Sequence, residues 1–318
     1  MTLCVSDVFL KGLVPDDPSL VTRTEIVRPA MSGHNSLLVG QIGDWTWDAV
    51  TEVCGTDVLR ARNPAGAPTY LSFYYYRIRG SRAFHLRTPT FGDRLHVSSQ
   101  LFDFGRESVL TLHRIGRSGN GPAGFTAEEF YRSDDEGSLY VENYNRWISR
   151  AYGSSSNREL VRSAPADFRR HLLPLLPDRY SPRPLCHRAK SVHTFRPDHP
   201  DGDRHLPAGG VHHARYPVDI TRDLNAVGLL YFAAYFSIVD RALLQCWRSL
   251  GRSDRAFLDR VVVDQQLCYL ANADSDCVID ASSQRFEIAG DGEHELFDVV
   301  LRDRDRVLAV STLRLLIP

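Results

Sequence analysis

Hydrophobic and polar residues follow a pattern that predicts one helix and then several strands, and this order occurs twice along the chain. In the first half, apolar residues at Trp47, Val50 and Cys54 share one face of a helix that ends at Gly55. The stretches after it either alternate between apolar and polar residues or are rich in aromatic residues, as strands are. These predicted strands are 69–78, 94–104, 108–115, 125–131 and 138–147.

The second half repeats this order more clearly. A short strand at 213–218 and a polar turn at 219–225 precede a long helix at 226–250, which ends before Gly251. Apolar residues occur on most sides of this helix, so we expect neighbouring elements to cover most of its surface. Strands are predicted at 260–270, 275–281, 285–288, 295–301 and 307–315, and the charged run 302–306 is a hairpin turn.

A buried helix followed by four or five antiparallel strands, present twice, predicts an α+β fold of the double hot-dog type. Each sheet then curls around its own helix, and the two sheets join edge to edge. This inference comes from the order of elements, because the two halves share little sequence. We place an N-terminal hot-dog at 1–153, a Ser- and Pro-rich linker at 154–184 with a short helix at 167–173, and a C-terminal hot-dog at 185–318.

Composition excludes several classes of function. The 318 residues are 43% hydrophobic and 24% charged, which is usual for a globular protein. A net charge of −1 gives no bulk attraction to nucleic acid. No apolar run is long enough to span a membrane, and the first residues have no secretory pattern, so we expect a cytoplasmic protein. The six cysteines include no C-x-x-C pair and are expected to be reduced.

Standard catalytic motifs are absent or out of place. The sequence has no Walker motif, H-E-x-x-H or G-x-S-x-G. The run 119–124 matches G-x-G-x-x-G, but it contains Pro122 between two predicted strands and is expected to be a hairpin loop. Five histidines between 193 and 213 lack regular ligand spacing, so we expect a solvated loop there, no metal site and no cofactor. Because 36 of the 38 basic residues are arginine, an anionic ligand would be met by guanidinium groups.

Three segments carry a family resemblance. They are Tyr70-Leu71-Ser72-Phe73, residues 156–160, and residues 223–235, where an acidic residue, an amide and a glycine precede an aromatic-rich helix start. The last segment resembles hot-dog thioesterases and dehydratases. In that superfamily the chain most resembles the bifunctional acyltransferase/decarboxylases of polyketide biosynthesis, of the leinamycin-pathway type. Its lead-in to the first helix, at 31–36, departs from the pattern of those relatives, which affects the choice of substrate more than the fold.

The resemblance implies an activity. Such enzymes take methylmalonyl from coenzyme A, decarboxylate it and deliver propionyl to an acyl carrier protein, so acyl-CoA and a carrier protein are the expected partners. Tyr70 matches the family's catalytic tyrosine. A phenol is a poor nucleophile unless activated, so Tyr70 could form a covalent acyl adduct or donate a hydrogen bond to the enolate oxygen. Without the resemblance, Tyr70 is more typical of a core aromatic residue, because Tyr74, Tyr75 and Tyr76 follow it closely.

Five polar residues are candidates for substrate binding, each with a structural alternative. His34 and Asn35 precede the first helix, and Asp223 and Asn225 precede the second, so all four could face the thioester or cap a helix. Asn157 matches the family pattern, but its position also suits a turn in the linker.

Carrier proteins are acidic, so their docking surface should be basic. Clustered arginines after Tyr70 make that edge the candidate: Arg77, Arg79, Arg82 and Arg87. Two other functions remain open. One is a simple hot-dog enzyme, either a thioesterase with Asp223 as base or a dehydratase with His34, and the other is a non-catalytic acyl-binding scaffold. The oligomeric state is open as well, with a homodimer as one option.

Overall fold

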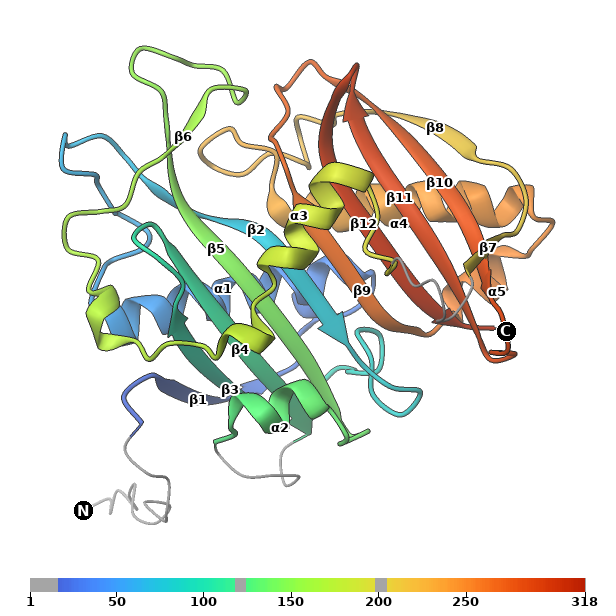
Figure 1. The fold of residues 1–318 in the computed structure, drawn as a ribbon, viewed down its shortest axis with the longest axis horizontal. Helices are drawn as coiled ribbons and strands as arrows, with labels where there is room; N and C mark the ends of the chain where they lie inside the picture. Colours follow the sequence, from blue (N-terminus) through green and yellow to red (C-terminus); the bar gives the residue numbers. More distant parts are fainter. Residues whose placement is uncertain (1–16, 118–123, 198–204, 318) are drawn as a thin grey trace, which may run out of the picture.

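The computed structural model describes residues 17–117, 124–197 and 205–317 (Figure 1). Both halves contain the same succession of one strand, one long helix and four strands. In the first half these are β1 (Leu20–Ile26), α1 (Asn35–Cys54), β2 (Tyr70–Arg79), β3 (Arg94–Asp103), β4 (Ser108–Arg117) and β5 (Ser138–Arg150). In the second they are β8 (His212–Pro217), α4 (Phe232–Ser249), β9 (Val262–Tyr269), β10 (Val278–Ile288), β11 (His294–Asp303) and β12 (Arg306–Leu316).

Smaller elements lie within and between the two sets. They are three 3-10 turns (Pro29–Met31, Arg170–Leu172 and Asp178–Tyr180), α2 (Ala127–Arg132), β6 (Leu160–Arg162), α3 (Arg183–Val192), β7 (His205–Pro207) and α5 (Asp254–Leu258).

The strands form one continuous antiparallel sheet in the order β1-β3-β4-β5-β2-β9-β12-β11-β10-β7. The halves join where residues 75–79 of β2 pair with residues 264–268 of β9. β8 pairs with β10 as β1 pairs with β3, so the second half repeats the strand order of the first. This arrangement confirms the predicted double hot-dog.

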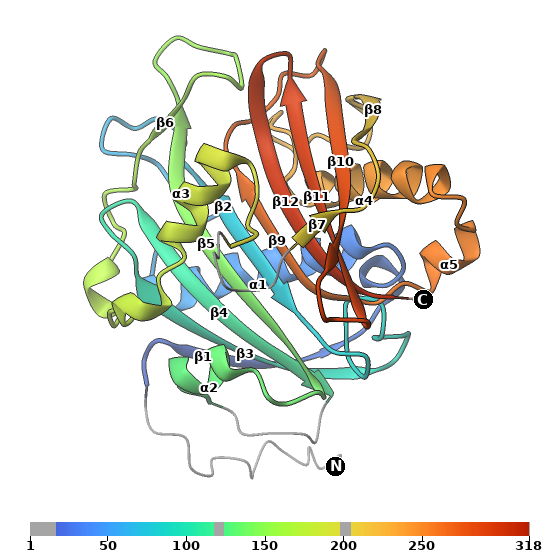
Figure 2. The same ribbon diagram turned by 45° about the vertical axis from the view of Figure 1, so that its right-hand side comes forward.

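The two long helices lie on the same face of the sheet, and α3 crosses the opposite face (Figures 1 and 2). One large apolar cluster extends through both halves and includes Ile42 and Trp45 of α1 with Phe236 and Leu243 of α4. Two glycines of α1 allow the helices to approach closely. Gly40 lies against the Tyr231 hydroxyl, and Gly43 lies against the ring of Phe232. The start of α4 is therefore packed directly on α1.

The second long helix begins six residues later than predicted. Residues 226–231 form a turn instead, because the Asn225 side-chain oxygen accepts hydrogen bonds from the Val227 and Leu229 amides, at 3.1 and 3.0 Å. Gly228 adopts a φ of 75°, which ends any helical run there. An Asn that bonds to nearby backbone amides favours a turn over a helix.

The predicted strand at 125–131 is wrong, because α2 occupies this segment. Thr126 and Glu129 form a capping box, in which the Thr126 side chain accepts from the Glu129 amide and Glu129 accepts from the Thr126 amide. The predicted strands at 275–281 and 285–288 are one strand, β10, and the helix predicted at 167–173 is reduced to the 3-10 turn at Arg170–Leu172. β1 and α3 were not predicted. Most of the G-x-G-x-x-G run at 119–124 lies outside the described residues, as do Cys4, Lys11 and His199.

Candidate functional site

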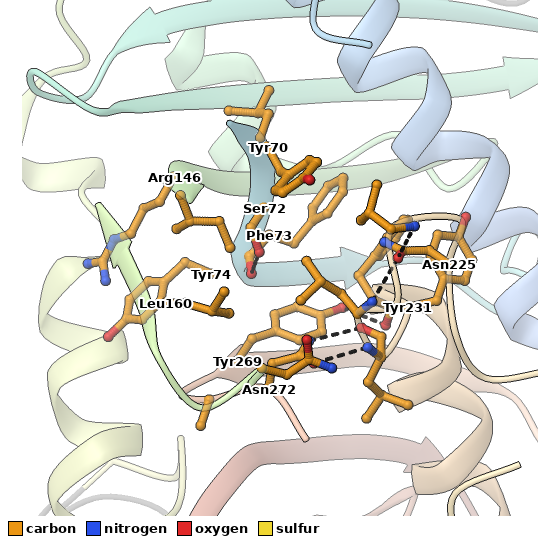
Figure 3. Close-up of a pocket in the computed structure, with 18 of the residues that line it drawn as sticks. Tyr70, Ser72, Phe73, Tyr74, Arg146, Leu160, Asn225, Tyr231, Tyr269 and Asn272 are labelled. Carbon is orange, nitrogen blue, oxygen red and sulfur yellow. Dashed lines mark hydrogen bonds between the residues drawn. The ribbon is translucent and has the colours of Figure 1, made fainter. Parts of the chain in front are cut away.

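A pocket opens where the two halves of the sheet separate. β2 and β9 pair only from Tyr75 and Cys268 onward, so residues 70–74 of β2 diverge from residues 269–272 at the end of β9. The turn 225–231 and the first residue of α4 line the angle between them. The resulting cavity has a volume of about 540 Å³ (Figure 3). Both halves of the chain therefore contribute to its wall.

The lining is apolar and aromatic, with few ionisable groups. Among the described residues that line the pocket there is no Asp, Glu, His, Cys or Lys. Its charged side chains are Arg146, Arg158, Arg162 and Arg306. Arg158 pairs with Asp274 and Asp303, at 3.1 and 2.7 Å. The other three have no carboxylate partner in the described part of the chain, so the pocket is suited to an anionic ligand.

Asn225 presents a hydrogen-bond donor of fixed orientation. Because its side-chain oxygen is held by the Val227 and Leu229 amides, the Nδ2 group must point the other way. Nδ2 has no acceptor among the described residues, and Asn225 lines the pocket (Figure 3). Nearby, the N-cap residue of α4 is Tyr231, which makes no side-chain capping bond. The N-terminus of this 18-residue helix thus adds positive partial charge to the same side of the pocket.

Several phenols line the cavity. Tyr70, the first residue of β2, is half-buried, and no described residue hydrogen-bonds to its hydroxyl (Figure 3). Burial raises the pKa of Tyr231 to about 12, and the carboxylate of Asp44 adds to the effect. Burial also raises the pKa of Tyr74 to about 12. Tyr231 and Tyr74 therefore remain protonated near neutral pH.

The structure brings Tyr70, Asn157 and Asn225 together in the pocket lining. Asn157 is only 4% exposed, and its side chain is fully engaged. Its Nδ2 donates to the carbonyls of Gly228 and Ala273, at 2.7 and 2.9 Å, while its oxygen accepts from Arg150 at 2.9 Å. Asn157 therefore ties the linker to the turn before α4 and has no donor left for substrate.

Asp223 lies outside the pocket lining. Its carboxylate, 1% exposed, accepts from the Tyr216 hydroxyl at 2.7 Å and the Asp219 amide at 2.9 Å, and it pairs with Arg222 at 3.4 Å. Its carbonyl accepts from the Tyr231 amide at 2.8 Å. Asp223 thus stabilises the turn before α4 and is not placed to activate a water in the pocket.

His34 and Asn35 are also outside the lining. His34 is an exposed N-cap residue of α1 whose Nδ1 lies 2.6 Å from Ser36 Oγ, and Asn35 is buried. The fold offers two equivalent helix starts, and the pocket lies at that of α4. Sequence patterns identified both starts but did not indicate which one opens into a cavity.

Two of the four arginines predicted to dock a carrier protein have internal partners. Arg77 forms two hydrogen bonds to Asp264, at 3.0 and 2.6 Å. Arg79 donates to the carbonyls of Phe130 and Tyr131, at 2.7 and 3.0 Å. These bonds connect β2 to β9 and α2. Of the four arginines, Arg82, which is exposed, and Arg87, which is half-buried, therefore remain as candidates for contact with a carrier protein.

Other lining residues were not identified from the sequence. Asn272 binds both backbone groups of Leu230, at 3.0 Å each, and so fixes the residue before the N-cap of α4 (Figure 3). Arg146 lies on the ring of Tyr74, with its guanidinium carbon 3.3 Å from the ring centre. Their positions depend on how the two sheets diverge, which local patterns do not encode. No helix within the described segments has the length and apolar character that a membrane span needs.

Comparison with known proteins agrees with this architecture. The sequence model of the family described as "LnmK N-terminal Hot Dog Fold domain" matches residues 22–197, more than half of the chain. Among solved structures, one assigned as an oleoyl thioesterase from Lactobacillus plantarum has a TM-score of 0.58 at 11% identity, over 94% of this chain and 97% of that one. The 12:0-ACP thioesterase from Umbellularia californica has a TM-score of 0.52 at 12% identity, over 93% of each chain.

A third solved structure, an acyl-ACP thioesterase from Bacteroides thetaiotaomicron, has a TM-score of 0.54 at 9% identity, over 95% of this chain and all of that one. At such low identities these similarities establish the fold alone. No curated protein sequence matches the chain.

Proposed function

We propose, from the premise that this chain belongs to the LnmK N-terminal hot dog fold family, that it decarboxylates a malonyl-type acyl thioester and transfers the product to an acyl carrier protein. The substrate class is a methylmalonyl-type acyl-CoA, and the product is a propionyl thioester on the carrier protein. Coenzyme A is part of the substrate, and the proposal requires no further cofactor.

The observation that carries this proposal is the absence of a proton acceptor in the pocket. Its described lining contains hydrogen-bond donors and guanidinium groups but no carboxylate, imidazole or thiol. Decarboxylation needs no base, because the electrons come from the breaking bond to the carboxylate. It needs stabilisation of the negative charge that develops on the thioester oxygen. Donors without a base favour decarboxylation over hydrolysis.

The chemistry balances with the groups available. The bond between the α-carbon and the carboxylate breaks, CO₂ leaves, and the electron pair passes to the thioester oxygen as an enolate. The Tyr70 hydroxyl, Asn225 Nδ2 and the N-terminus of α4 are the donors suited to hold this oxygen. A proton from solvent then restores the α-carbon. Finally, the carrier-protein thiol attacks the carbonyl and coenzyme A leaves as its thiol.

Hydrolysis is the competing function, because the similar solved structures are described as thioesterases. A water nucleophile needs a general base. Asp223 is bound to Tyr216 and Arg222 outside the pocket, and His34 lies at the other helix start. The carboxylate of Asp44 in α1 helps to raise the pKa of Tyr231, but Asp44 is not part of the lining. A thioesterase would need a base from outside the lining, and Asp44 is a candidate for it.

Incubation with methylmalonyl-CoA and a phosphopantetheinylated acyl carrier protein separates the candidate functions. We expect release of CO₂ and propionyl on the carrier protein. Free acid with coenzyme A would indicate a thioesterase and contradict the proposal. Unchanged substrate would favour the non-catalytic scaffold.

Two conservative substitutions test the enolate donors. Tyr70→Phe removes one hydroxyl and should lower the decarboxylation rate about 10²- to 10³-fold. Asn225→Asp keeps the side-chain oxygen that organises the turn but replaces the free donor with an acceptor, so it should cause a loss of similar size without unfolding the protein. Wild-type turnover in both variants would refute the assignment. Intact-mass measurement during turnover then tells whether Tyr70 carries an acyl adduct or acts only as a donor.

A further inference from the structure

The helix α3 lies on the face of the sheet opposite α1 and α4 (Figures 1 and 2). Its sequence, Arg-Pro-Leu-Cys-His-Arg-Ala-Lys-Ser-Val, contains three basic residues, a histidine and no acidic residue. Arg183, His187 and Lys190 are exposed and lie at helical spacing on one side, although Arg183 also donates a hydrogen bond to the Phe104 carbonyl at 2.8 Å. We call these three side chains the α3 row. The C-terminal residue of the helix, Val192, is 53% exposed and adds an apolar contact point beside the row.

The helix α3 lies beside one wall of the pocket, although none of its residues lines the cavity. Cys186, on the buried side of α3, belongs to the same apolar cluster as Cys268 of β9, where β9 begins to pair with β2. Tyr74 of the pocket lining packs against the apolar cluster that contains Cys186. Arg146 and Tyr74 point from the strands toward this helix (Figure 3). A chain entering the pocket past Arg146 would therefore pass beside α3.

We propose that the α3 row is the docking surface for an acidic acyl carrier protein, whose phosphopantetheine arm enters the pocket past Arg146. This rests on the proposed function, since it names the partner surface of the same site. Two features favour such an occupant. The helix presents positive charge without intervening carboxylates. The pocket lining adds Arg146 and Arg162, which have no carboxylate partner among the described residues. Both complement an acidic protein that carries a phosphate-linked arm.

The position of the pocket along β2 disfavours the alternative surface around Arg82. The pocket is lined by residues 70–74 of β2, whereas Arg82 follows the other end of that strand. Nine steps from Tyr70 to Arg79 at about 3.3 Å each separate the two ends by about 30 Å. This separation exceeds the length of an extended phosphopantetheine arm. A carrier protein docked at Arg82 could not deliver its thioester to Tyr70.

The amine content of the chain allows a direct test. Lys190 is one of only two lysines, and the other, Lys11, lies in the N-terminal segment. A zero-length carbodiimide crosslinker joins amines to carboxylates and does not couple guanidinium groups. Treating the protein with a phosphopantetheinylated carrier protein should therefore give an adduct through Lys190, identified by peptide mass spectrometry. Lys190→Arg should abolish this adduct while preserving transfer, because the charge is kept.

Kinetics provide the second readout. The double variant His187→Glu/Lys190→Glu should lower kcat/KM for the carrier protein about tenfold at low salt, with a weaker effect at high salt. Decarboxylation of methylmalonyl-pantetheine, which has no protein carrier, should be unchanged. The control Arg82→Glu/Arg94→Glu reverses two exposed charges at the end of the sheet where β2 ends and β3 begins, and should leave both activities intact.

An adduct through Lys11 or the terminal amine alone would overturn the docking proposal, as would equal carrier-protein kinetics in the α3 variant and the wild type. If the wild type fails to decarboxylate methylmalonyl-pantetheine, the proposed function fails instead. The site of crosslinking then still decides whether the α3 row binds a carrier protein.

Discussion

Gly43→Ala tests how closely the two helices must approach to shape the pocket. A Cβ at this position would overlap Cζ of Phe232 and lie 2.8 Å from its Cε1. Phe232 cannot retreat toward β2, because its ring is stacked on Phe73 with centroids 4.0 Å apart. The ring must therefore move into the cavity that it lines. The substitution should reduce the space for an acyl group.

Two opposing terms set the effect of Gly43→Ala on stability. Alanine is favoured over glycine within a helix by about 0.5–1 kcal/mol. Overpacking a filled interior costs about 1–3 kcal/mol. The net effect should be a loss of about 1 kcal/mol in the free energy of unfolding, which for a chain of 318 residues corresponds to a fall in Tm of about 1–2 °C.

Thermal and denaturant unfolding of Gly43→Ala, Phe232→Leu and the double variant would measure the contact directly. Because the smaller leucine makes room for the new methyl group, the double variant should be more stable than the two single effects predict, by about 1 kcal/mol. Gly40→Ala is the matched control, since its Cβ would lie 3.0 Å from the mobile end of Tyr231 and should be tolerated better. A stabilised Gly43→Ala protein with no coupling to Phe232 would refute this account of the interface.

Three further outcomes are expected. Burial, and to a smaller extent the charge of Arg23, lowers the pKa of His113 to about 3, so below pH 6.5 the unfolded state binds a proton that the native state does not. The free energy of unfolding, measured with urea, should therefore fall by about 2 kcal/mol between pH 7.5 and pH 5. In His113→Asn this free energy should depend less on pH. Asp44→Asn should retain decarboxylation in a CO₂-release assay, because Asp44 is not part of the pocket lining, and a loss of CO₂ release would show that the reaction depends on this carboxylate. Asn157→Ala should lower the free energy of unfolding by about 1–3 kcal/mol, and an unchanged Tm would contradict its bridging role.

Much of the fold could be predicted because its elements have long, regular patterns. The apolar faces of α1 and α4 and the alternation in the strands are local properties of the sequence. Errors arose where short-range polar bonds override these patterns. The Asn225 side chain holds residues 226–231 as a turn, and the Thr126–Glu129 capping box forms a helix where Phe125 and Phe130 suggested a strand. The capping pattern T-x-x-E was present in the sequence and would have indicated α2.

The site was harder to predict because it depends on contacts between the halves. Tyr70 and Asn225 were found through the family resemblance and do line one cavity. Arg146 and Asn272 belong to the wall only because β2 and β9 stop pairing beyond Tyr75 and Cys268. That divergence is a property of the assembled sheet. Asp223 and Asn157 have the polarity of catalytic residues, but their hydrogen bonds serve the backbone around the pocket.

Covalent linkage of the two hot-dogs affects how substitutions can accumulate in such a protein. Two identical chains related by a twofold axis would place the same residues at both helix starts, so each substitution would alter two sites at once. Here one strand-edge junction combines Tyr70 from one repeat with Asn225 from the other. Each repeat can therefore vary independently, and residues at the start of α1, such as His34 and Asn35, can change without altering the lining of this pocket. The tandem chain is in effect a covalently linked heterodimer, and separating its halves would divide the described pocket between two fragments.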